Sequence, residues 1–176
     1  MFSCKGRKKK RRFVFTIGLI YENGQILLVY KKFGKFGVGK WNGPGGLVEE
    51  GESVEECCCR EFLEETSSTP EAKDGILVKK LKEVGLAEFE FQSMPGQIRE
   101  CHIFKILGYS GKAKENYQMT PVWFRFEDIP FNSNKIWRSD EIWLRLLLAG
   151  KKFRGWFLYD NPENGRLLEY RLKTVK

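Results

Sequence analysis

The sequence contains no apolar run close to the ~20 residues that a membrane-spanning helix requires, so no membrane association is expected. It contains no internal repeat and no linker that would divide it into domains. Its one histidine, His102, lies in an apolar stretch, which favours a structural role over a catalytic one. A chain of 176 residues without these features is expected to form one domain with a sizeable core.

The number and spacing of the cysteines do not fit a disulfide framework. The count is five, which is odd, and three of them are adjacent, at Cys57, Cys58 and Cys59. Adjacent residues of a helix fan out by ~100° per step, so these three cannot jointly hold a zinc ion. We expect them to be small packing residues in a reducing compartment.

The excess of positive charge is concentrated at the N-terminus. The formal net charge is +8, and the basic residues crowd into Lys5 and residues 7–12. We expect residues 1–12 to be a mobile, solvated tail and residues 13–176 to form the domain. The tail could be a nuclear-import signal or a weak tether for nucleic acid, although a short basic run alone makes neither specific.

This basic run and the apolar stretch Phe13–Tyr21 together imitate a signal peptide. Polar Glu22-Asn23-Gly24 follows at once, and no small-residue cleavage site is present. We therefore expect a cytosolic location, with the nucleus as a second compartment.

Apolar, β-branched and alternating stretches predict a chain rich in strands. Strands are expected over residues 13–21, 25–31, 83–92, 98–107, 122–126, 153–159 and 167–172. Helices are expected from Ser53 to about Thr66 and over Ser139–Ala149. Between them lie a glycine-punctuated loop, Gly34 to Gly46, and a polar loop, Ser67 to Gly75, expected at the surface. The result is one mixed α/β domain.

The first predicted helix has an unusual acidic face. Glu61, Glu64 and Glu65 are spaced i, i+3 and i+4, which places their carboxylates on one side about 100° wide. They lie in the C-terminal half, where the helix dipole disfavours each anion by ~0.3–1 kcal/mol. An acid-rich helix can simply be a solvated face. Bound divalent cations would instead make the crowding favourable, because Mg²⁺ takes carboxylate oxygens.

The context of these glutamates favours the second interpretation. Gly46 is followed after five residues by Glu52, after seven more by Arg60-Glu61, and then by Glu64-Glu65. This spacing resembles the Nudix box, G-x5-E-x7-R-E-U-x-E-E-x-G-U, where U is bulky and apolar. The box departs at its end, where Ser67 and Ser68 replace the glycine and the apolar residue. If Ser67 had to be left-handed, the conformation would cost about 1 kcal/mol.

Membership of the Nudix hydrolases would imply an α/β/α sandwich around a mixed sheet and hydrolysis of a nucleoside diphosphate linked to another group. The resemblance makes Glu61, Glu64, Glu65 and Gly46 ligands of Mg²⁺, with Mn²⁺ as an alternative. It gives Glu65 a part in deprotonating water. It makes Glu52 and Arg60 partners that hold the loop and the glutamates in place.

Further segments resemble the MutT-homologue branch, which hydrolyses oxidised purine nucleoside triphosphates of the 8-oxo-dGTP and 2-hydroxy-dATP type. They are Lys40 to Gly46, Phe89-Glu90-Phe91, Asp128 to Phe131, Trp137 to Trp143, and Leu146-Leu147-Leu148 with Lys151-Lys152-Phe153. The likeness covers nearly all of the chain after the basic tail, with an insertion around Ser68–Gly75. It implies a small nucleotide substrate and a monomer.

In that branch an aromatic-lined pocket holds the base. The resemblance assigns base or substrate contacts to Asn42, Trp137, Asp140, Thr16, Phe36, Phe89, Phe91, Gly45 and Gly46. Lys31 or Lys32 could hold the triphosphate. From spacing alone, Phe89 and Phe91 could equally face a core, Trp137 could be a core residue, and Asn42 could shape a turn.

Two departures put the substrate in question. The branch has adjacent aspartates where this chain has Ser139-Asp140, and Gln118 stands where a late metal-binding glutamate is expected. A narrower or different base preference would follow. Alternatives are a Nudix hydrolase of dinucleoside polyphosphates or nucleotide sugars, or a nucleic-acid-binding Nudix module that uses the basic tail.

Overall fold

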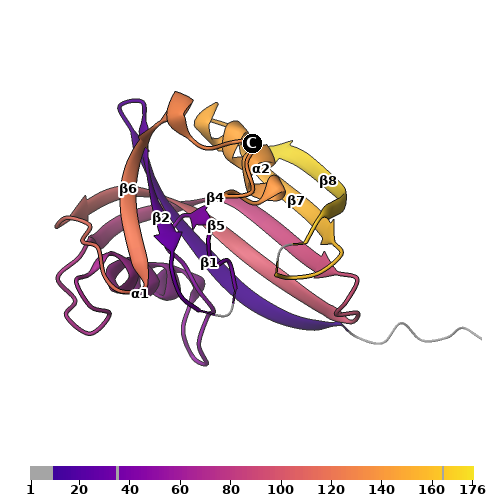
Figure 1. Cartoon of the computed structure of the whole chain (residues 1–176), viewed down its shortest axis with the longest axis horizontal. Helices are drawn as coiled ribbons and strands as arrows, with labels where there is room; N and C mark the ends of the chain where they lie inside the picture. Colours follow the sequence, from indigo (N-terminus) through magenta and orange to yellow (C-terminus); the bar gives the residue numbers. More distant parts are fainter. Residues whose placement is uncertain (1–9, 35, 164) are drawn as a thin grey trace, which may run out of the picture.

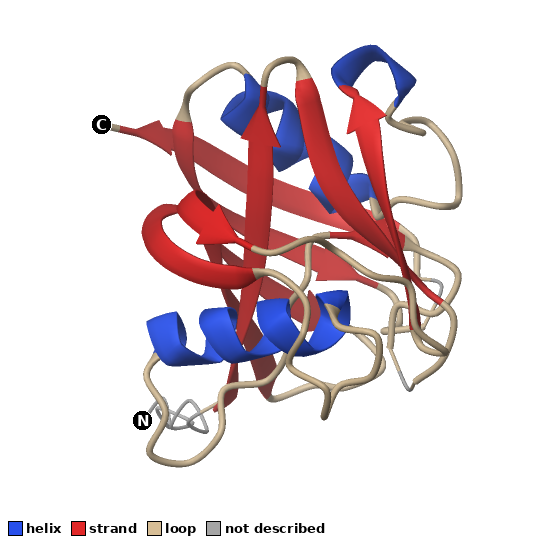
Figure 2. Cartoon of the chain, turned by 90° about the vertical axis from the view of Figure 1, so that its left-hand side faces the viewer, coloured by secondary structure: helices blue, strands red, loops and turns tan. Residues whose placement is uncertain are grey.

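The computed structural model describes residues 10–34, 36–163 and 165–176. Cys4 and most of the predicted basic tail lie outside these residues. Within them, one mixed sheet has a helix on each side, as Figures 1 and 2 show. In the described ranges, no helix combines the length and the apolar character needed to cross a membrane.

The described residues form eight strands and two α-helices. The strands are β1 (Arg11–Glu22), β2 (Gln25–Lys31), β3 (Trp41–Asn42), β4 (Leu77–Phe91), β5 (Gln97–Ser110), β6 (Met119–Arg125), β7 (Lys152–Tyr159) and β8 (Leu167–Val175). The helices are α1 (Val54–Thr66) and α2 (Arg138–Leu148), with a short 3₁₀ helix η1 (Phe126–Asp128) after β6.

The sheet runs in the order β3-β2-β1-β5-β4-β7-β8, and β6 pairs with β2. The pairs β1–β5 and β4–β7 are parallel, and the other pairs are antiparallel, which confirms the predicted mixed sheet. Strand β1 begins two residues before the expected boundary, because Arg11 and Arg12 pair with Gln97 and Ile98. The ordered domain therefore includes the end of the predicted tail.

The turn between β1 and β2 confirms the predicted hairpin. Asn23 and Gly24 both have positive φ angles, 50° and 75°. Two such residues give a turn whose twist matches that of the flanking antiparallel strands. The hairpin places Ile20 opposite Leu27, and both side chains are buried in the same core cluster.

Each helix packs an apolar face on its own side of the sheet. Phe62 and Cys58 of α1 lie against Ile20 and Phe104, while Trp143 of α2 lies in the cluster on the other face. Burying a side chain such as Phe62 contributes roughly 1.5–3 kcal/mol. Cys57, Cys58 and Cys101 are buried free thiols, and Cys59 is a partly exposed one. The prediction that the adjacent cysteines are packing residues is thus confirmed, because Cys59 also packs against the core cluster that contains Cys58.

The loop after α1 differs from the expected surface loop at its ends. Ser68 and residues 71–74 are exposed, but Ser67 and Gly75 are buried. Ser67 has a φ of −86° and a ψ of 158°, so it is extended and not left-handed. Its hydroxyl donates to Leu63 O at 2.6 Å and accepts from Gly75 N at 2.9 Å. The serine therefore closes this turn with side-chain hydrogen bonds and needs no glycine conformation.

Candidate active site

The predicted capping box fixes the start of α1. The Ser53 side chain accepts from the Glu56 backbone at 3.2 Å, and the Glu56 carboxylate accepts from Ser53 N at 2.9 Å. With the helix register set in this way and Phe62 buried, the other side of α1 presents Glu61 and Glu65 next to the glycine-rich loop.

Arg60 organises these acids from the centre of the cluster. Its Nε and Nη2 donate to the two carboxylate oxygens of Glu52 at 2.8 and 2.9 Å, and its Nη1 donates to Glu61 Oε1 at 2.8 Å. Glu64 is 3.5 Å from the same Nη1. The hydrogen bond from Arg60 lowers the pKa of Glu52 to about 2. Glu52 and Arg60 thus make the contacts that the predicted positioning role requires.

Glu65 points to the loop on the far side of Arg60. Its Oε2 accepts from Gly45 N at 3.0 Å. Burial raises the pKa of Glu65 to about 8, against the opposing hydrogen bond from Gly45. Burial also raises the pKa of Glu61. Nearby cations oppose these shifts without cancelling them. Arg60 and Lys31 lower the pKa of Glu61, and Lys31 lowers the pKa of Glu65.

Two glycines let the loop approach these groups. A β-carbon on Gly46 would lie 2.2 Å from Glu61 Oε1, and one on Gly45 would lie 2.0 Å from Thr16 O. The Gly46 carbonyl accepts from Thr16 N at 2.9 Å, which attaches the loop to β1. Only glycine allows this close approach at either position.

The described residues contain no cluster of three or more His, Cys, Asp or Glu already arranged to hold a metal ion. Arg60 accounts for part of this, because its guanidinium occupies oxygens of Glu61 and Glu64. The donor chemistry nevertheless suits a hard divalent cation: carboxylate oxygens from Glu61, Glu64 and Glu65 lie on one helix with too little positive charge to offset burial.

Next to Glu65 lies a pocket of ≈150 Å³ between the sheet and α2. The residues that line it include ten of the eleven predicted to bind substrate: Thr16, Lys31, Phe36, Asn42, Gly45, Gly46, Phe89, Phe91, Trp137 and Asp140. Ser139 lines it too. The pocket walls are mainly apolar, which suits a planar heterocycle with a few polar contacts.

Asp140 is the buried acid of this pocket, with 5% of its surface exposed. Its Oδ1 accepts from Ser139 Oγ at 3.0 Å and from Trp143 Nε1 at 3.1 Å. Its Oδ2 has no hydrogen-bond partner among the described residues. Burial raises the pKa of Asp140 to about 7. The carboxyl can thus offer an acceptor or a protonated donor to a ligand near neutral pH.

Ser139 does not reproduce a second acid. Its hydroxyl accepts from Tyr159 at 2.8 Å while it donates to Asp140, so its hydrogen-bonding groups are used within the protein. Glu141 does not line the pocket and pairs with Arg138 and Arg145 instead. The pocket therefore contains Ser139-Asp140, the pair that the resemblance aligns with the adjacent aspartates of the branch.

Aromatic rings form part of the pocket wall. Phe36 stacks on Trp137 with ring centroids 5.3 Å apart and planes 12° apart, and Phe89 stacks on Phe157 at 5.4 Å. Trp137 and Phe91 are buried and contact the core as well as the pocket. These rings are therefore both core residues and pocket residues, so the two interpretations are compatible.

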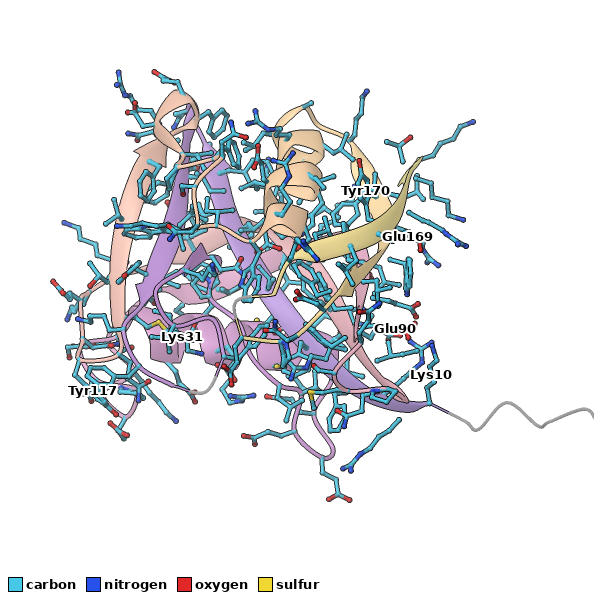
Figure 3. The ribbon with its side chains drawn as sticks, turned by 45° about the vertical axis from the view of Figure 1, so that its right-hand side comes forward. Lys10, Lys31, Glu90, Tyr117, Glu169 and Tyr170 are labelled. Carbon is cyan, nitrogen blue, oxygen red and sulfur yellow. The ribbon has the colours of Figure 1, made fainter. Side chains whose placement is uncertain are left out.

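The two candidate phosphate-binding lysines differ. Lys31 lines the pocket close enough to Glu61 and Glu65 to lower their pKa values, and Figure 3 shows its position beside α1. Lys32 is absent from the pocket lining and pairs with Glu115 at 3.0 Å. Gln118 donates to the Tyr117 hydroxyl at 2.7 Å.

Sequence reasoning missed several residues of the pocket, among them Lys40, Arg99, Met119 and Tyr159. These four come from the loop before β3 and from three separate strands. Period-two alternation along β5 places Arg99 on the same face as Cys101, but the sequence does not show which element covers that face. His102 is not part of the pocket and lies between Glu83 and Glu100.

Comparisons with known proteins agree with this geometry. A protein of Mus musculus named oxidized purine nucleoside triphosphate hydrolase is 38% identical over 162 residues, covering 92% of this chain and 95% of its own. The protein of the same name from Danio rerio is 36% identical over 163 residues, covering 93% and 96%. A crystal structure of a MutT protein from Bacillus halodurans superposes with a TM-score of 0.74 at 25% identity, covering 91% of this chain and 97% of its own. The family described as NUDIX domain matches residues 9–147, and the chain belongs to this family.

Proposed function

We propose that this chain is a Mg²⁺-dependent pyrophosphohydrolase that converts oxidised purine nucleoside triphosphates and water into the nucleoside monophosphate and pyrophosphate. The names of the two animal relatives support the substrate class. The observation on which the proposal rests is a single pocket that contains Glu65 of the acid helix at one side and Trp137 and Asp140 at another. A base in the aromatic part would have its phosphates at the acids.

Divalent metal ions, when bound, would neutralise the polyphosphate and lower the pKa of water. The chain's own groups supply the rest. Glu61, Glu64 and Glu65 provide the oxygen ligands, and Arg60 holds Glu61 in place. Glu65, whose Oε2 accepts from Gly45 N and which lines the pocket, is the carboxylate placed to take a proton from the attacking water.

The base would be bound by stacking and by hydrogen bonds. Trp137 offers a stacking face, and Asn42 and Asp140 offer polar groups. With Ser139 bonded inside the protein, one carboxyl edge, Asp140 Oδ2, faces the ligand. A single carboxyl supports a narrower choice of bases than a pair that shares a proton.

The proposal is tested by a substrate screen. Oxidised and normal purine triphosphates, dinucleoside polyphosphates and nucleotide sugars are each incubated with Mg²⁺, Mn²⁺ or neither, and products are identified by mass. Monophosphate plus pyrophosphate from an oxidised purine triphosphate, dependent on the metal, is the expected result. Faster hydrolysis of a dinucleoside polyphosphate or a nucleotide sugar would overturn the assignment.

The nucleic-acid-binding alternative has less support. Lys10 and Arg12, at the end of the basic run, form ion pairs with Glu90 and with Glu88 and Glu100, and Figure 3 shows Lys10 beside Glu90. Deleting residues 1–9 leaves β1 intact and discriminates the two functions. Turnover should survive, whereas a nucleic-acid-binding module would lose its affinity for RNA or DNA. The monomeric state and the cytosolic or nuclear location stay predictions.

A further inference from the structure

The pocket contains a positive charge that the proposed mechanism does not use. Arg99, on β5, lines it together with Trp137 and Asp140, and about half of the residue is buried. No hydrogen bond or ion pair within the described ranges involves its guanidinium, although the same ranges include many other ion pairs. A half-buried guanidinium with unused donors is costly unless a ligand provides acceptors.

The contacts that Arg99 does make are with aromatic rings. Its guanidinium carbon lies 4.7 Å from the centroid of Phe36, 4.9 Å from that of Phe91 and 6.0 Å from that of Phe15. Stacking of this kind uses the flat faces of the guanidinium and leaves the N–H groups in its plane free. Phe36 in turn stacks on Trp137. The guanidinium therefore belongs to the aromatic end of the pocket.

Its position separates it from the phosphate-binding part. Lys31 lies at the acid end, where it lowers the pKa values of Glu61 and Glu65. Arg99 lies among the rings that would contact a base. Of the three cations that line the pocket, Lys40 donates to Asn134 O, which leaves Lys31 suited to phosphate oxygens and Arg99 suited to the heterocycle.

We infer that Arg99 determines base specificity, by donating hydrogen bonds from its in-plane N–H groups to carbonyl oxygens of an oxidised guanine. This inference rests on the proposed function and names the preferred base within it. Oxidised guanine presents carbonyl oxygens at positions 6 and 8, whereas 8-oxoadenine has an amino group at position 6. With 8-oxoadenine, the N–H groups of Arg99 would face the 6-amino group, which is also a donor. Arg99 therefore favours the guanine-type substrate.

Asp140 and Arg99 would bind different polar groups of the base. Asp140 Oδ2, which lacks a partner, accepts from ring or amino N–H groups, while Arg99 serves the carbonyl oxygens. An acceptor and a donor of this kind together complement the alternating edge of an oxidised guanine. Neither group could serve a purely aromatic ligand without being left unsatisfied.

The test compares 8-oxo-dGTP with 8-oxo-dATP for the wild type, Arg99→Met and Arg99→Lys. Methionine preserves contact with Phe36 and Phe91 without charge, and lysine preserves charge without the planar fork. The ratio of kcat/KM for the two nucleotides should fall about tenfold or more in Arg99→Met, mainly through KM for 8-oxo-dGTP. Arg99→Lys should be intermediate. The control, Arg154→Met, replaces an exposed arginine of β7 outside this pocket and should leave the ratio unchanged.

A second measurement separates failure of this inference from failure of the proposed function. Binding of 8-oxo-dGMP and 8-oxo-dAMP is measured by calorimetry without metal, on variants that unfold cooperatively. Base-selective binding that Arg99→Met abolishes would support the inference even if no triphosphate were hydrolysed. Equal losses of affinity for both bases would overturn the inference and place the guanidinium on the phosphates. Absence of binding by the wild type would also overturn the inference.

Discussion

The backbone of Gly46 lies so close to Glu61 that a β-carbon at position 46 would sit 2.2 Å from Oε1 of its carboxylate. That oxygen is also the one that accepts from Arg60 Nη1 at 2.8 Å. The loop and the helix are therefore fitted to each other at the atom that the proposed mechanism needs most.

Gly46→Ala should move the Glu61 carboxylate away from Arg60 and from the other acids. Misplacement of a catalytic group by about 1 Å can lower turnover about a hundredfold, and we expect a loss of that order with a raised requirement for Mg²⁺. Steady-state kinetics over a range of Mg²⁺ concentrations measure both. In the control, Gly108→Ala, the new β-carbon would meet its nearest neighbour, Lys80, at 3.4 Å. Normal turnover in Gly46→Ala would contradict the assignment.

Glu65→Gln should abolish most turnover and leave the fold intact. The glutamine oxygen can still accept from Gly45 N, but it can neither take a proton from water nor bring negative charge to a cation. We expect kcat to fall by roughly 10²–10⁴-fold, measured by mass spectrometry of the products beside a thermal unfolding curve. Glu55→Gln, an exposed change on the first turn of the same helix, is the matched control. Retained activity in Glu65→Gln would remove this residue from the mechanism.

Ser67→Ala tests the unexpected end of α1. The hydroxyl donates to Leu63 O and accepts from Gly75 N, and the residue is fully buried, so its loss leaves two backbone groups without a partner. The free energy of unfolding should fall by about 1–3 kcal/mol. Ser93→Ala, at an exposed turn position, should stay within about 0.5 kcal/mol of the wild type. Urea unfolding measures the free energy of unfolding of both variants. An unchanged value for Ser67→Ala would show that these hydrogen bonds contribute nothing to stability.

The same position shows where sequence patterns mislead. A resemblance gave Ser67 the place of a glycine, and a left-handed conformation would have followed from that place alone. The chain instead leaves the helix in an extended conformation, because the side chain makes the closing hydrogen bonds. Spacing identifies which residue stands at a position, but the conformation also depends on neighbours such as Gly75, eight residues later.

The acid helix could be predicted because its information is local. A capping box fixes its start, and the helical period then places Glu61, Glu64 and Glu65 on one side. The contact between Arg60 and Glu52 is also short in sequence, and the motif includes it. These features need no knowledge of the sheet.

The pocket could be predicted only where the resemblance supplied it. Arg99 enters through the pairing of β5 with β1 and β4, and no short-range pattern reveals which strand neighbours it. Lys32 shows the reverse: it directly follows Lys31, the last residue of β2, but it pairs with Glu115 and does not line the pocket. The sequence shows that a residue is charged, but the direction in which its side chain points depends on the surrounding structure.

Asp140→Asn should change how stability depends on pH. Burial raises the pKa of Asp140 from 3.8 to about 7, so the folded protein binds its proton more tightly than the unfolded chain does. Stability contributed by this group is therefore lost as pH rises between these two values and changes little above them. Between about pH 5.5 and pH 8.5 the wild type should lose about 2 kcal/mol more than Asp140→Asn, in which the group cannot ionise.

Urea unfolding at the two pH values measures this difference, and the same variant tests the role of Asp140 in binding. The carboxyl of Asp140 offers an acceptor when ionised and a donor when protonated, whereas an asparagine amide has a fixed donor and acceptor. The KM of the wild type for 8-oxo-dGTP should therefore vary with pH near 7, where Asp140 titrates, and that variation should be absent in Asp140→Asn. If the variant kept both the stability slope and the KM profile of the wild type, the ionisation of Asp140 would be responsible for neither.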